Sequence, residues 1–328
     1  MLALPWLHSY AVTMIGVLTS RRLARLAAVS FVCLGTFASP VRAQTRGLYT
    51  PGMSATNSGA LPEAGLTYIA AVQSYSFDTL KGADGEQLPV DLTTSVFVEQ
   101  NLLVWVSDFK ILGGAYAASA NLPIATTSLT LVRFGALQAG SGLSDSDYSP
   151  LTLAWQWSRA DIQAGYGFVV PTGRFQAGAS DNTGGGYWAH IPSAGQTVYL
   201  TTNKATAASA YEMYEFHGTQ KSTGVRPGQT FDIDYSVTQM VPLTRDKGTL
   251  VQFGLVGYGQ YQTTDHTGGN VNEAIAARTH YKVNALGIAA SVVVPERKIE
   301  VGVKYLNEFA NEATVQGYSL QITAAMTF

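Results

Sequence analysis

The sequence predicts an all-β fold, a transmembrane antiparallel β-barrel of about 12 strands, within a range of 12 to 14. Three observations predict this fold. Beyond residue 43 no apolar run reaches the roughly 18 residues of a membrane-spanning helix, although 46% of the chain is hydrophobic and 13% is charged. From about Gly65 onward, segments of roughly 10 to 16 residues alternate in polarity. The chain ends in an amphipathic strand that closes on Phe328.

Composition excludes two other classes of protein. The formal net charge of the chain is -2 and no basic patch stands out, so we expect no nucleic-acid partner. The chain has 33 Gly and 17 Tyr among few charged residues, whereas disordered chains are highly charged and poor in aromatic residues.

Residues 1–43 have the composition of a signal peptide. They contain no acid, they carry arginines at positions 21, 22 and 25, and an apolar run from Leu26 to Ala38 precedes the small residue Ala43. Met14 is an alternative start of the protein. Removal of residues 1–43 takes away four arginines and no acid, so the exported chain has 16 basic and 22 acidic residues. It has no thiol, because the only cysteine, Cys33, lies in the removed segment.

The exported chain divides into two parts. Residues 44–63 contain Pro51, Gly52 and Pro62 and no convincing strand, so we expect them to fold into the lumen as a plug or to form a periplasmic lead. Residues 64–328 form the expected barrel.

Thirteen segments read as strands between turn residues. They are 64–76, 90–106, 110–122, 124–138, 150–158, 161–171, 195–202, 205–217, 229–241, 248–262, 278–294, 297–309 and 315–328. Because bacterial barrels normally have an even number of strands, we expect one wrong boundary, within 110–138 or 195–217.

The cost of charge in hydrocarbon orients the strands, because Arg or Lys facing lipid at mid-bilayer destabilises a barrel by roughly 2 to 4 kcal/mol. In 229–241, Asp232 and Asp234 alternate with apolar residues and therefore point into the lumen. In 297–309, Glu300 and Lys304 do the same. In 278–294 the polar face holds Lys282.

The last segment, 315–328, is apolar at every second position and ends on Phe328. Such an aromatic end matches the sorting signature of outer-membrane barrels, so we expect the barrel-insertion machinery to recognise Phe328. The alternative is the closing strand of a secreted β-sandwich, whose polar face is usually richer in charge.

Aromatic residues near strand ends predict the two girdles of a barrel at the membrane interfaces. They are Trp105, Trp155, Trp157, Tyr187, Trp188, Tyr258 and Tyr261. The long connections 172–194, 218–228 and 263–277 are expected to be extracellular.

Several segments together resemble a known family. They are Gly59–Gly65, Trp105–Gly114, Gly142–Asp145, Ser149–Trp155, Val170–Phe175, Asp181–Trp188 and Gly254–Tyr261. In order and spacing they resemble the outer-membrane family of the MetA pathway of phenol degradation, also called SphA-like proteins. The resemblance covers almost the whole exported chain and implies a barrel in the outer membrane of a Gram-negative bacterium, in contact with lipid and lipopolysaccharide.

The resemblance also implies a function. It implies an outer-membrane channel for passive uptake of small hydrophobic or aromatic compounds. The alternative is a non-transporting structural or surface-interaction barrel with a closed lumen. We find no nucleophile beside a histidine, no metal-ligand spacing and no phosphate loop, so we expect no enzyme, no catalytic residue, no metal and no cofactor.

The polar groups assigned to the lumen are the candidate solute path. They are Glu99, Arg133, Gln156, Asp232, Asp234, Gln252, His280, Lys282, Glu300 and Lys304. Asp232 and Asp234 with Lys282 are the expected constriction, and an internal stabilising network is the alternative role.

Overall fold

The structure is a computed structural model that describes residues 46–328, with the exception of residues 91, 132–134, 180, 246–247, 270 and 278. The expected signal peptide, residues 1–43, lies outside the described residues. In the part of the chain that is described, no helix is long and apolar enough to cross a membrane.

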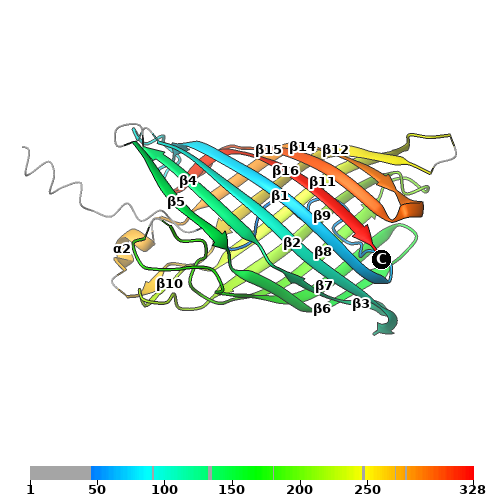
Figure 1. Ribbon diagram of the computed structural model, residues 1–328, viewed down its shortest axis with the longest axis horizontal. Helices are drawn as coiled ribbons and strands as arrows, with labels where there is room; N and C mark the ends of the chain where they lie inside the picture. Colours follow the sequence, from blue (N-terminus) through cyan, green and yellow to red (C-terminus); the bar gives the residue numbers. More distant parts are fainter. Residues whose placement is uncertain are drawn as a thin grey trace, which may run out of the picture. The chain divides into compact units, whose positions relative to one another are not determined.

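Long antiparallel strands make up most of the described chain (Figure 1). They are β1 (Gly65–Leu80), β2 (Leu92–Ile111), β3 (Gly114–Asn121), β4 (Ile124–Leu131), β5 (Gly135–Leu143), β6 (Ser146–Gln156), β7 (Ala160–Val170), β8 (Ala189–Tyr199), β9 (Thr206–His217), β11 (Thr230–Pro242), β12 (Leu250–Gln262), β14 (Lys282–Val294), β15 (Ile299–Glu308) and β16 (Val315–Thr327). The short elements are β10 (Val225–Arg226), β13 (Thr267–Gly268), helix α2 (Glu273–Ala276) and the 3-10 helix η1 (Pro295–Arg297).

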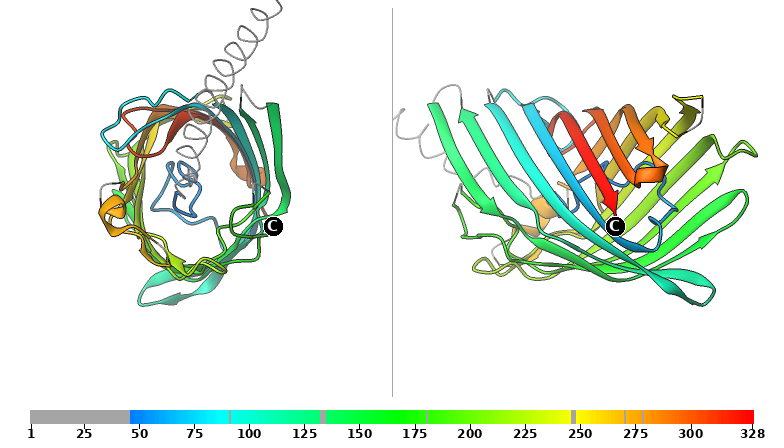
Figure 2. Two further views of the ribbon diagram at one scale, coloured as in Figure 1. Left: turned by 90° about the vertical axis from the view of Figure 1, so that its left-hand side faces the viewer. Right: turned by 45° about the vertical axis from the view of Figure 1, so that its right-hand side comes forward.

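The sheet closes on itself because β1 pairs with β16 along one edge and with β2 along the other. The closed ring contains β1, β16, β15, β14, β12, β11, β9, β8, β7, β6, β3 and β2, which are twelve strands. Figure 2 shows the resulting cylinder from two further directions. The expected antiparallel barrel of about twelve strands is therefore confirmed.

The two remaining strands, β4 and β5, lengthen one hairpin of the ring. Asn121 of β3 pairs with Leu102, and Ile124 of β4 pairs with Glu99, so the register along β2 does not change between them. Pro123 lies at the break and has no N–H to donate to a neighbouring strand. The expected strands 110–122 and 124–138 are therefore one wall strand, and the boundary between them was wrong. The next wall strand begins at Gly135 of β5 and continues into β6.

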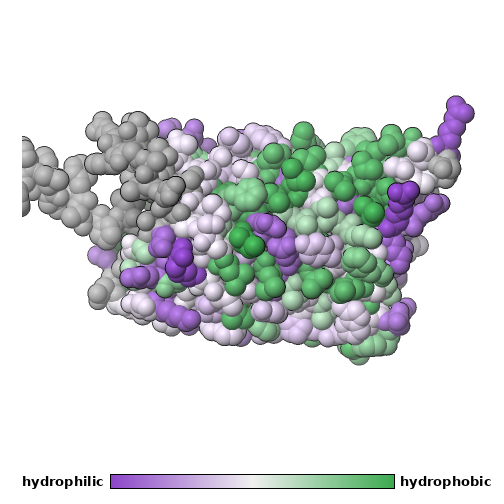
Figure 3. Space-filling view, viewed as in Figure 1, coloured by the Kyte–Doolittle hydropathy of each residue, from purple (hydrophilic) through white to green (hydrophobic). Residues whose placement is uncertain are grey.

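Alternation along most strands separates an apolar outer face from a polar inner face. In β16, Tyr318, Leu320 and Ile322 are 47%, 42% and 50% exposed, whereas Ser319 and Gln321 are fully buried. On the face drawn in Figure 3, hydrophobic residues form patches over the barrel wall, with more polar residues between them. Apolar residues outside and polar residues inside is the arrangement that a lipid environment favours.

The two ends of the barrel differ in their connections. Short turns at one end join β3 to β2, β7 to β6 and β15 to β14, and the last of these contains η1 and Lys298, whose φ is 52°. Long connections at the other end carry β10, β13 and α2. In barrels of this type the short turns are periplasmic and the long connections extracellular, and we orient this barrel accordingly.

Candidate functional site

The lumen is occupied by residues 46–63, which we call the lumen segment. Figure 2 shows this segment as the blue trace inside the ring of strands. It reaches the extracellular half of the wall at Arg46, which contacts Glu308 and Val315. It then runs toward the periplasmic end, where the chain enters β1 at Gly65.

Asp234 of β11 binds the middle of the lumen segment. Its carboxylate accepts hydrogen bonds from the Tyr49 hydroxyl at 2.7 Å and from the backbone N–H groups of Gly52 at 2.8 Å and Ser54 at 2.9 Å. Asp234 is 1% exposed, so these bonds replace the water that a carboxylate would otherwise bind. An inward carboxylate of the wall is thus satisfied by the segment.

Glu215 of β9 binds the segment in the same way. It accepts hydrogen bonds from the N–H groups of Leu48 at 2.7 Å and Tyr49 at 2.9 Å, and its Oε2 lies 2.8 Å from Nε2 of His217. Two inward carboxylates on neighbouring strands therefore satisfy backbone amides that would otherwise have no partner inside the barrel.

The first described residue of the segment forms a buried ion pair. Arg46 donates to both oxygens of Glu308, at 2.7 Å and 3.1 Å, and its guanidinium lies 5.2 Å from the ring centre of Tyr75. Glu308 also accepts hydrogen bonds from the hydroxyls of Tyr75 and Tyr258. This arrangement pairs the buried charge and fills the acceptor positions of the carboxylate, which an ion pair inside a protein needs.

Donors of the wall bind the segment's carbonyl oxygens. Lys304 of β15 donates to the carbonyls of Gly52 and Met53, at 2.8 Å each. The amide of Gln321 donates to the carbonyl of Pro51, and Gln252 exchanges hydrogen bonds with Asn57. Side chains of the wall therefore form hydrogen bonds with the segment along much of its length in the lumen.

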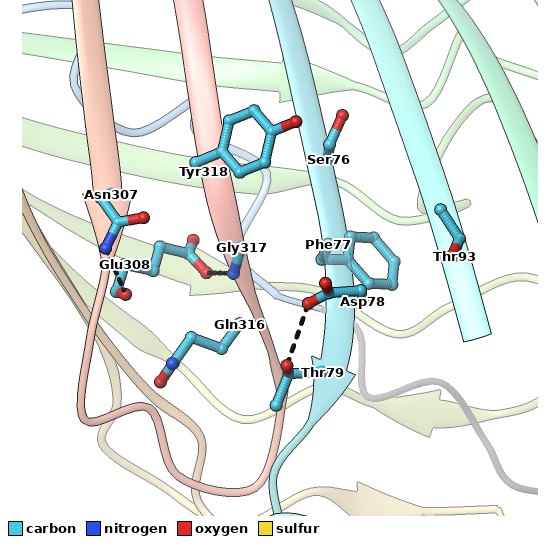
Figure 4. A pocket seen from close by; sticks show the side chains of 10 residues that line it. All are labelled: Ser76, Phe77, Asp78, Thr79, Thr93, Asn307, Glu308, Gln316, Gly317 and Tyr318. Atoms are coloured by element: carbon cyan, nitrogen blue, oxygen red, sulfur yellow. Dashed lines mark hydrogen bonds between the residues drawn. The ribbon is translucent and has the colours of Figure 1, made fainter. Parts of the chain in front are cut away.

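A cavity of about 340 Å³ lies at the extracellular ends of β1, β15 and β16 (Figure 4). It is lined by Ser76, Phe77, Asp78, Thr79, Thr93, Asn307, Glu308, Gln316, Gly317 and Tyr318. The register between β1 and β16 shifts between Phe77 and Thr79, and Gly317 approaches the wall so closely that a Cβ there would lie 2.0 Å from the Ser76 carbonyl oxygen. The cavity thus marks a β-bulge whose close backbone approach requires glycine.

Six of the ten candidate path residues lie on the inner face of the wall. They are Gln156, Asp232, Asp234, Gln252, Glu300 and Lys304. Of these, Asp234, Gln252 and Lys304 contact the lumen segment directly. Asp232 instead accepts a hydrogen bond from Gln260 of β12 at 2.7 Å.

Three candidates lie elsewhere, which corrects their expected positions. Glu99 lies on the outer face of β2, because its neighbour Gln100 faces the lumen and bonds to Asn121. Lys282 lies on the outer face at the extracellular rim, where it bonds to Glu312, and His280 bonds to Asp265 there. For Lys282 and His280 the error has a physical reason: at the rim a polar side chain reaches water, so its polarity does not require the lumen. Arg133 lies outside the described residues.

Two aromatic residues expected in the girdles also point inward. Tyr258 is 2% exposed and donates to Glu308, and Tyr187 is 1% exposed against His217. Burial, with Glu215 nearby, holds the pKa of Tyr187 well above its usual range, so this phenol stays neutral. Trp105, Trp157 and Trp188 are exposed on the outer surface, as girdle residues are.

Sequence analysis missed the contacts of Arg46 and Glu215 across the lumen. Arg46 binds Glu308 and Glu215 binds Leu48, each more than 160 positions away in the chain, so no local spacing indicates these contacts. The alternation of Met213, Glu215 and His217 in β9 was the available signal for Glu215, because these three side chains share one face.

The inner face of β2 differs from the polar wall opposite. Its inward side chains include Val96, Val98, Leu102, Val104 and Val106, which we call the apolar stripe. Gln100 interrupts the stripe once and bonds to Asn121, which in turn bonds to Asp147. By contrast, the inner face of β11 carries Asp232, Asp234, Ser236 and Thr238.

In the extracellular half of the wall, one strand edge has no partner strand among the described residues. β5 pairs with β4 along one edge, and no described strand pairs with the other edge. The connection 171–188 lies beside that edge: Thr183 donates to the Leu143 carbonyl at 2.8 Å, and Asp145 accepts from the N–H groups of Gly173 and Gly185. We call this place the β5 edge. Three of the segments that carry the family resemblance meet there.

No group of three or more His, Cys, Asp or Glu side chains that could hold a metal ion is present among the described residues. The site therefore consists of the lumen segment, the polar wall that binds it and the apolar stripe. Its described chemistry is hydrogen bonding, ion pairing and apolar contact.

Comparison with known proteins agrees with this architecture. The family model described as "Putative MetA-pathway of phenol degradation" matches residues 77–324. An outer membrane channel of Pseudomonas putida F1 superposes with a TM-score of 0.68 at 15% identity, covering 85% of this chain and 100% of that chain. The β domain of the Bordetella autotransporter BrkA reaches a TM-score of 0.48 at 10% identity, covering 81% and 100%.

No curated protein sequence matches the chain. The superposition on the Pseudomonas channel shows a shared fold, an outer-membrane β-barrel. The family match spans most of the described barrel. The chain belongs to the MetA-pathway family of phenol degradation.

Proposed function

We propose that the protein is an outer-membrane channel of a Gram-negative bacterium for passive uptake of small hydrophobic or aromatic compounds. The observation that carries this proposal is the apolar stripe on the inner face of β2. A channel for hydrophilic solutes has no use for a row of valine and leucine side chains facing its lumen. The family's link to phenol degradation supports the same class of solute.

Energetics favours an apolar solute on this wall. Burying apolar surface stabilises a complex by about 25 cal/mol per Å². A water-filled pore offers an aromatic molecule none of this, whereas Val96, Val98 and Leu102 are only half-buried and leave apolar surface toward the lumen. The stripe passes from the extracellular half of the wall at Val96 to the periplasmic half at Val106.

The lumen segment acts as a plug in this proposal. It fills the lumen between the polar wall and the stripe, so a solute passes only when the segment shifts. The bonds that hold it come from the polar side, through Asp234, Glu215 and Lys304. A movement of the part of the segment that faces β2 leaves these three contacts in place. We therefore propose that the solute passes between the segment and β2.

The β5 edge offers a second way out of the lumen. Backbone groups without a strand partner are costly in lipid, and at the end of β5 the connection 171–188 supplies a partner, because Thr183 donates to the Leu143 carbonyl. Movement of this connection would open the wall sideways between β5 and β7, and an apolar solute would then pass into the membrane.

The alternative function is a structural or surface-interaction barrel with a permanently closed lumen. The buried Arg46 and Glu308 pair favours it, because a pair with all acceptor positions filled holds the segment firmly. Under this alternative the lumen segment never moves and the stripe serves only as packing surface.

Dye uptake by intact cells separates the two functions. The full chain is expressed in a Gram-negative host, and the rate at which N-phenyl-naphthylamine becomes fluorescent is measured, because the outer leaflet of such cells slows apolar dyes. We expect faster uptake than in cells with an empty vector. Val98→Asn, in the stripe, should slow uptake severalfold, while Thr323→Asn on the inner face of β16 should not. Uptake equal to the empty-vector control would refute the channel.

A further inference from the structure

The lumen contains a compact apolar cluster near its periplasmic end. Val104, Val106 and Ala117 are buried there, and Ile69, Leu102 and Ala115 pack against them. These side chains come from β1, β2 and β3, which are neighbours in the ring. One residue of the lumen segment, Leu61, packs on the same cluster.

We propose that this cluster is a binding site for one small apolar molecule, such as a monocyclic aromatic hydrocarbon, and that Leu61 is its movable wall. The proposal rests on the proposed function for the direction of solute travel. The site itself is defined by the cluster and by Leu61, the hydrophobic residue of the segment that packs against it.

Leu61 differs from the rest of the segment in how it is held. Upstream, Tyr49, Gly52 and Gly59 are hydrogen bonded to wall side chains. Leu61 meets the wall through apolar contact, and the next residue, Pro62, has no N–H to donate. A residue held by apolar contact alone is replaced by an apolar ligand of similar surface without loss of a hydrogen bond.

Part of the cluster's apolar surface is accessible from the lumen. Leu61, Ile69, Leu102 and Ala115 are each half-buried, whereas Val104, Val106 and Ala117 below them are buried. The outer layer of the cluster therefore still presents apolar surface to the lumen. The cluster includes Leu102, Val104 and Val106 at the periplasmic end of the apolar stripe, so a solute that moves along β2 reaches this cluster last before the periplasm.

The chemistry of the lining sets the ligand class. None of the seven side chains of the cluster, with Leu61 included, carries a charge or a hydrogen-bonding group. An ionised or strongly polar solute would lose water here without a replacement partner. A hydrocarbon ring loses nothing and gains the burial of its surface.

Cysteine protection tests the site directly. The exported chain is expected to have no thiol, so Leu102→Cys introduces one reactive group in the cluster. The rate of its reaction with N-ethylmaleimide is measured in proteoliposomes with and without toluene. Ser193→Cys, inward and half-buried on β8, is the matched control for effects of toluene on the membrane or the reagent. Ala115→Cys repeats the test if Leu102→Cys fails to fold.

We expect toluene to slow labelling at least fivefold at position 102 and to leave position 193 unchanged. Leu61→Ala should lower the toluene concentration for half-protection severalfold, and Leu61→Ile should not change it. No protection at position 102 or 115, or equal protection at 193, would overturn the site. Protection that Leu61→Ala leaves unchanged would overturn the role of Leu61.

The outcome is independent of the uptake measurement. Protection at 102 together with dye uptake at the empty-vector rate supports the site and refutes the channel. Dye uptake without protection supports the channel and refutes the site.

Discussion

Replacing Asp234 by Asn should loosen the lumen segment. The change keeps the size of the side chain and removes its charge. In the structure the carboxylate accepts three hydrogen bonds from the segment, from the Tyr49 hydroxyl and from the N–H groups of Gly52 and Ser54. An Asn side chain retains one acceptor oxygen, which serves one of the two N–H groups, and its NH₂ group faces the other donors.

The magnitude follows from these contacts. A hydrogen bond to a charged group contributes about 1.5 to 3 kcal/mol, against about 0.5 to 1.5 kcal/mol for a neutral one. The Tyr49 hydroxyl can turn to accept from the amide, and Ser54 keeps its second partner, the Tyr49 oxygen at 3.0 Å. The net loss is therefore close to one charged bond, about 2 kcal/mol, which is roughly a 30-fold change in the equilibrium between the bound and the released segment.

The assay is labelling of a thiol placed on the segment. Met53→Cys is introduced alone and with Asp234→Asn, and the rate of modification by a water-soluble maleimide is compared in proteoliposomes. We expect roughly a 30-fold faster rate in the double variant if labelling requires release.

The matched control is Asp232→Asn, the same substitution on the same inner face of β11. Asp232 accepts from Gln260 of the wall, and no hydrogen bond joins it to the described part of the segment. Labelling of Met53→Cys should therefore stay near its original rate. Equal acceleration by both substitutions, or none by Asp234→Asn, would show that these bonds do not hold the segment.

Three further predictions use other parts of the barrel. Lys304→Met removes two hydrogen bonds to the segment, so labelling of Met53→Cys should become about tenfold faster. It also removes a positive charge from the lumen, so the reversal potential in a KCl gradient should move toward cation selectivity. An unchanged reversal potential would place Lys304 off the ion path. Asp145→Ala removes the acceptor that holds connection 171–188, so trypsin should cut after Arg174 several times faster in folded protein, with cutting after Lys204 as the internal control. Deletion of Phe328 should reduce the amount of barrel in the outer membrane without lowering the refolding yield in detergent. The variant Phe328→Tyr, which keeps an aromatic end, should assemble in the amount of the original protein. Equal amounts of barrel in the outer membrane with and without Phe328 would contradict its role in insertion.

Sequence reasoning succeeded where the period of the strand alone decides the outcome. In β11 and β15 every charged residue falls on one face of a strand whose other face is mostly apolar, so the cost of charge in lipid determines which face is inward. The closing strand β16 is equally clear. The inward face of such a strand can be predicted without knowing which strands pair with it.

It failed where both faces are apolar or where the strand meets the rim. The outer face of β2 carries Phe97, Leu103 and Trp105, while its inner face carries the apolar stripe, so one charge at Glu99 was a poor guide to orientation. In β14 the inward residues Val283 and Ala285 pack in a cluster with Ala55 of the lumen segment. The presence of that segment explains the apolar residues on the inner face of β14.

The sequence by itself determined the class of fold, because an alternating period over strands of this length is a local property that lipid imposes on each strand separately. The tertiary structure alone decided what fills the lumen. The contacts of Arg46, Tyr49 and Gly52 with Glu308, Glu215 and Asp234 join positions far apart in the chain, and they arise only after the ring has closed and brought these wall residues around one short segment.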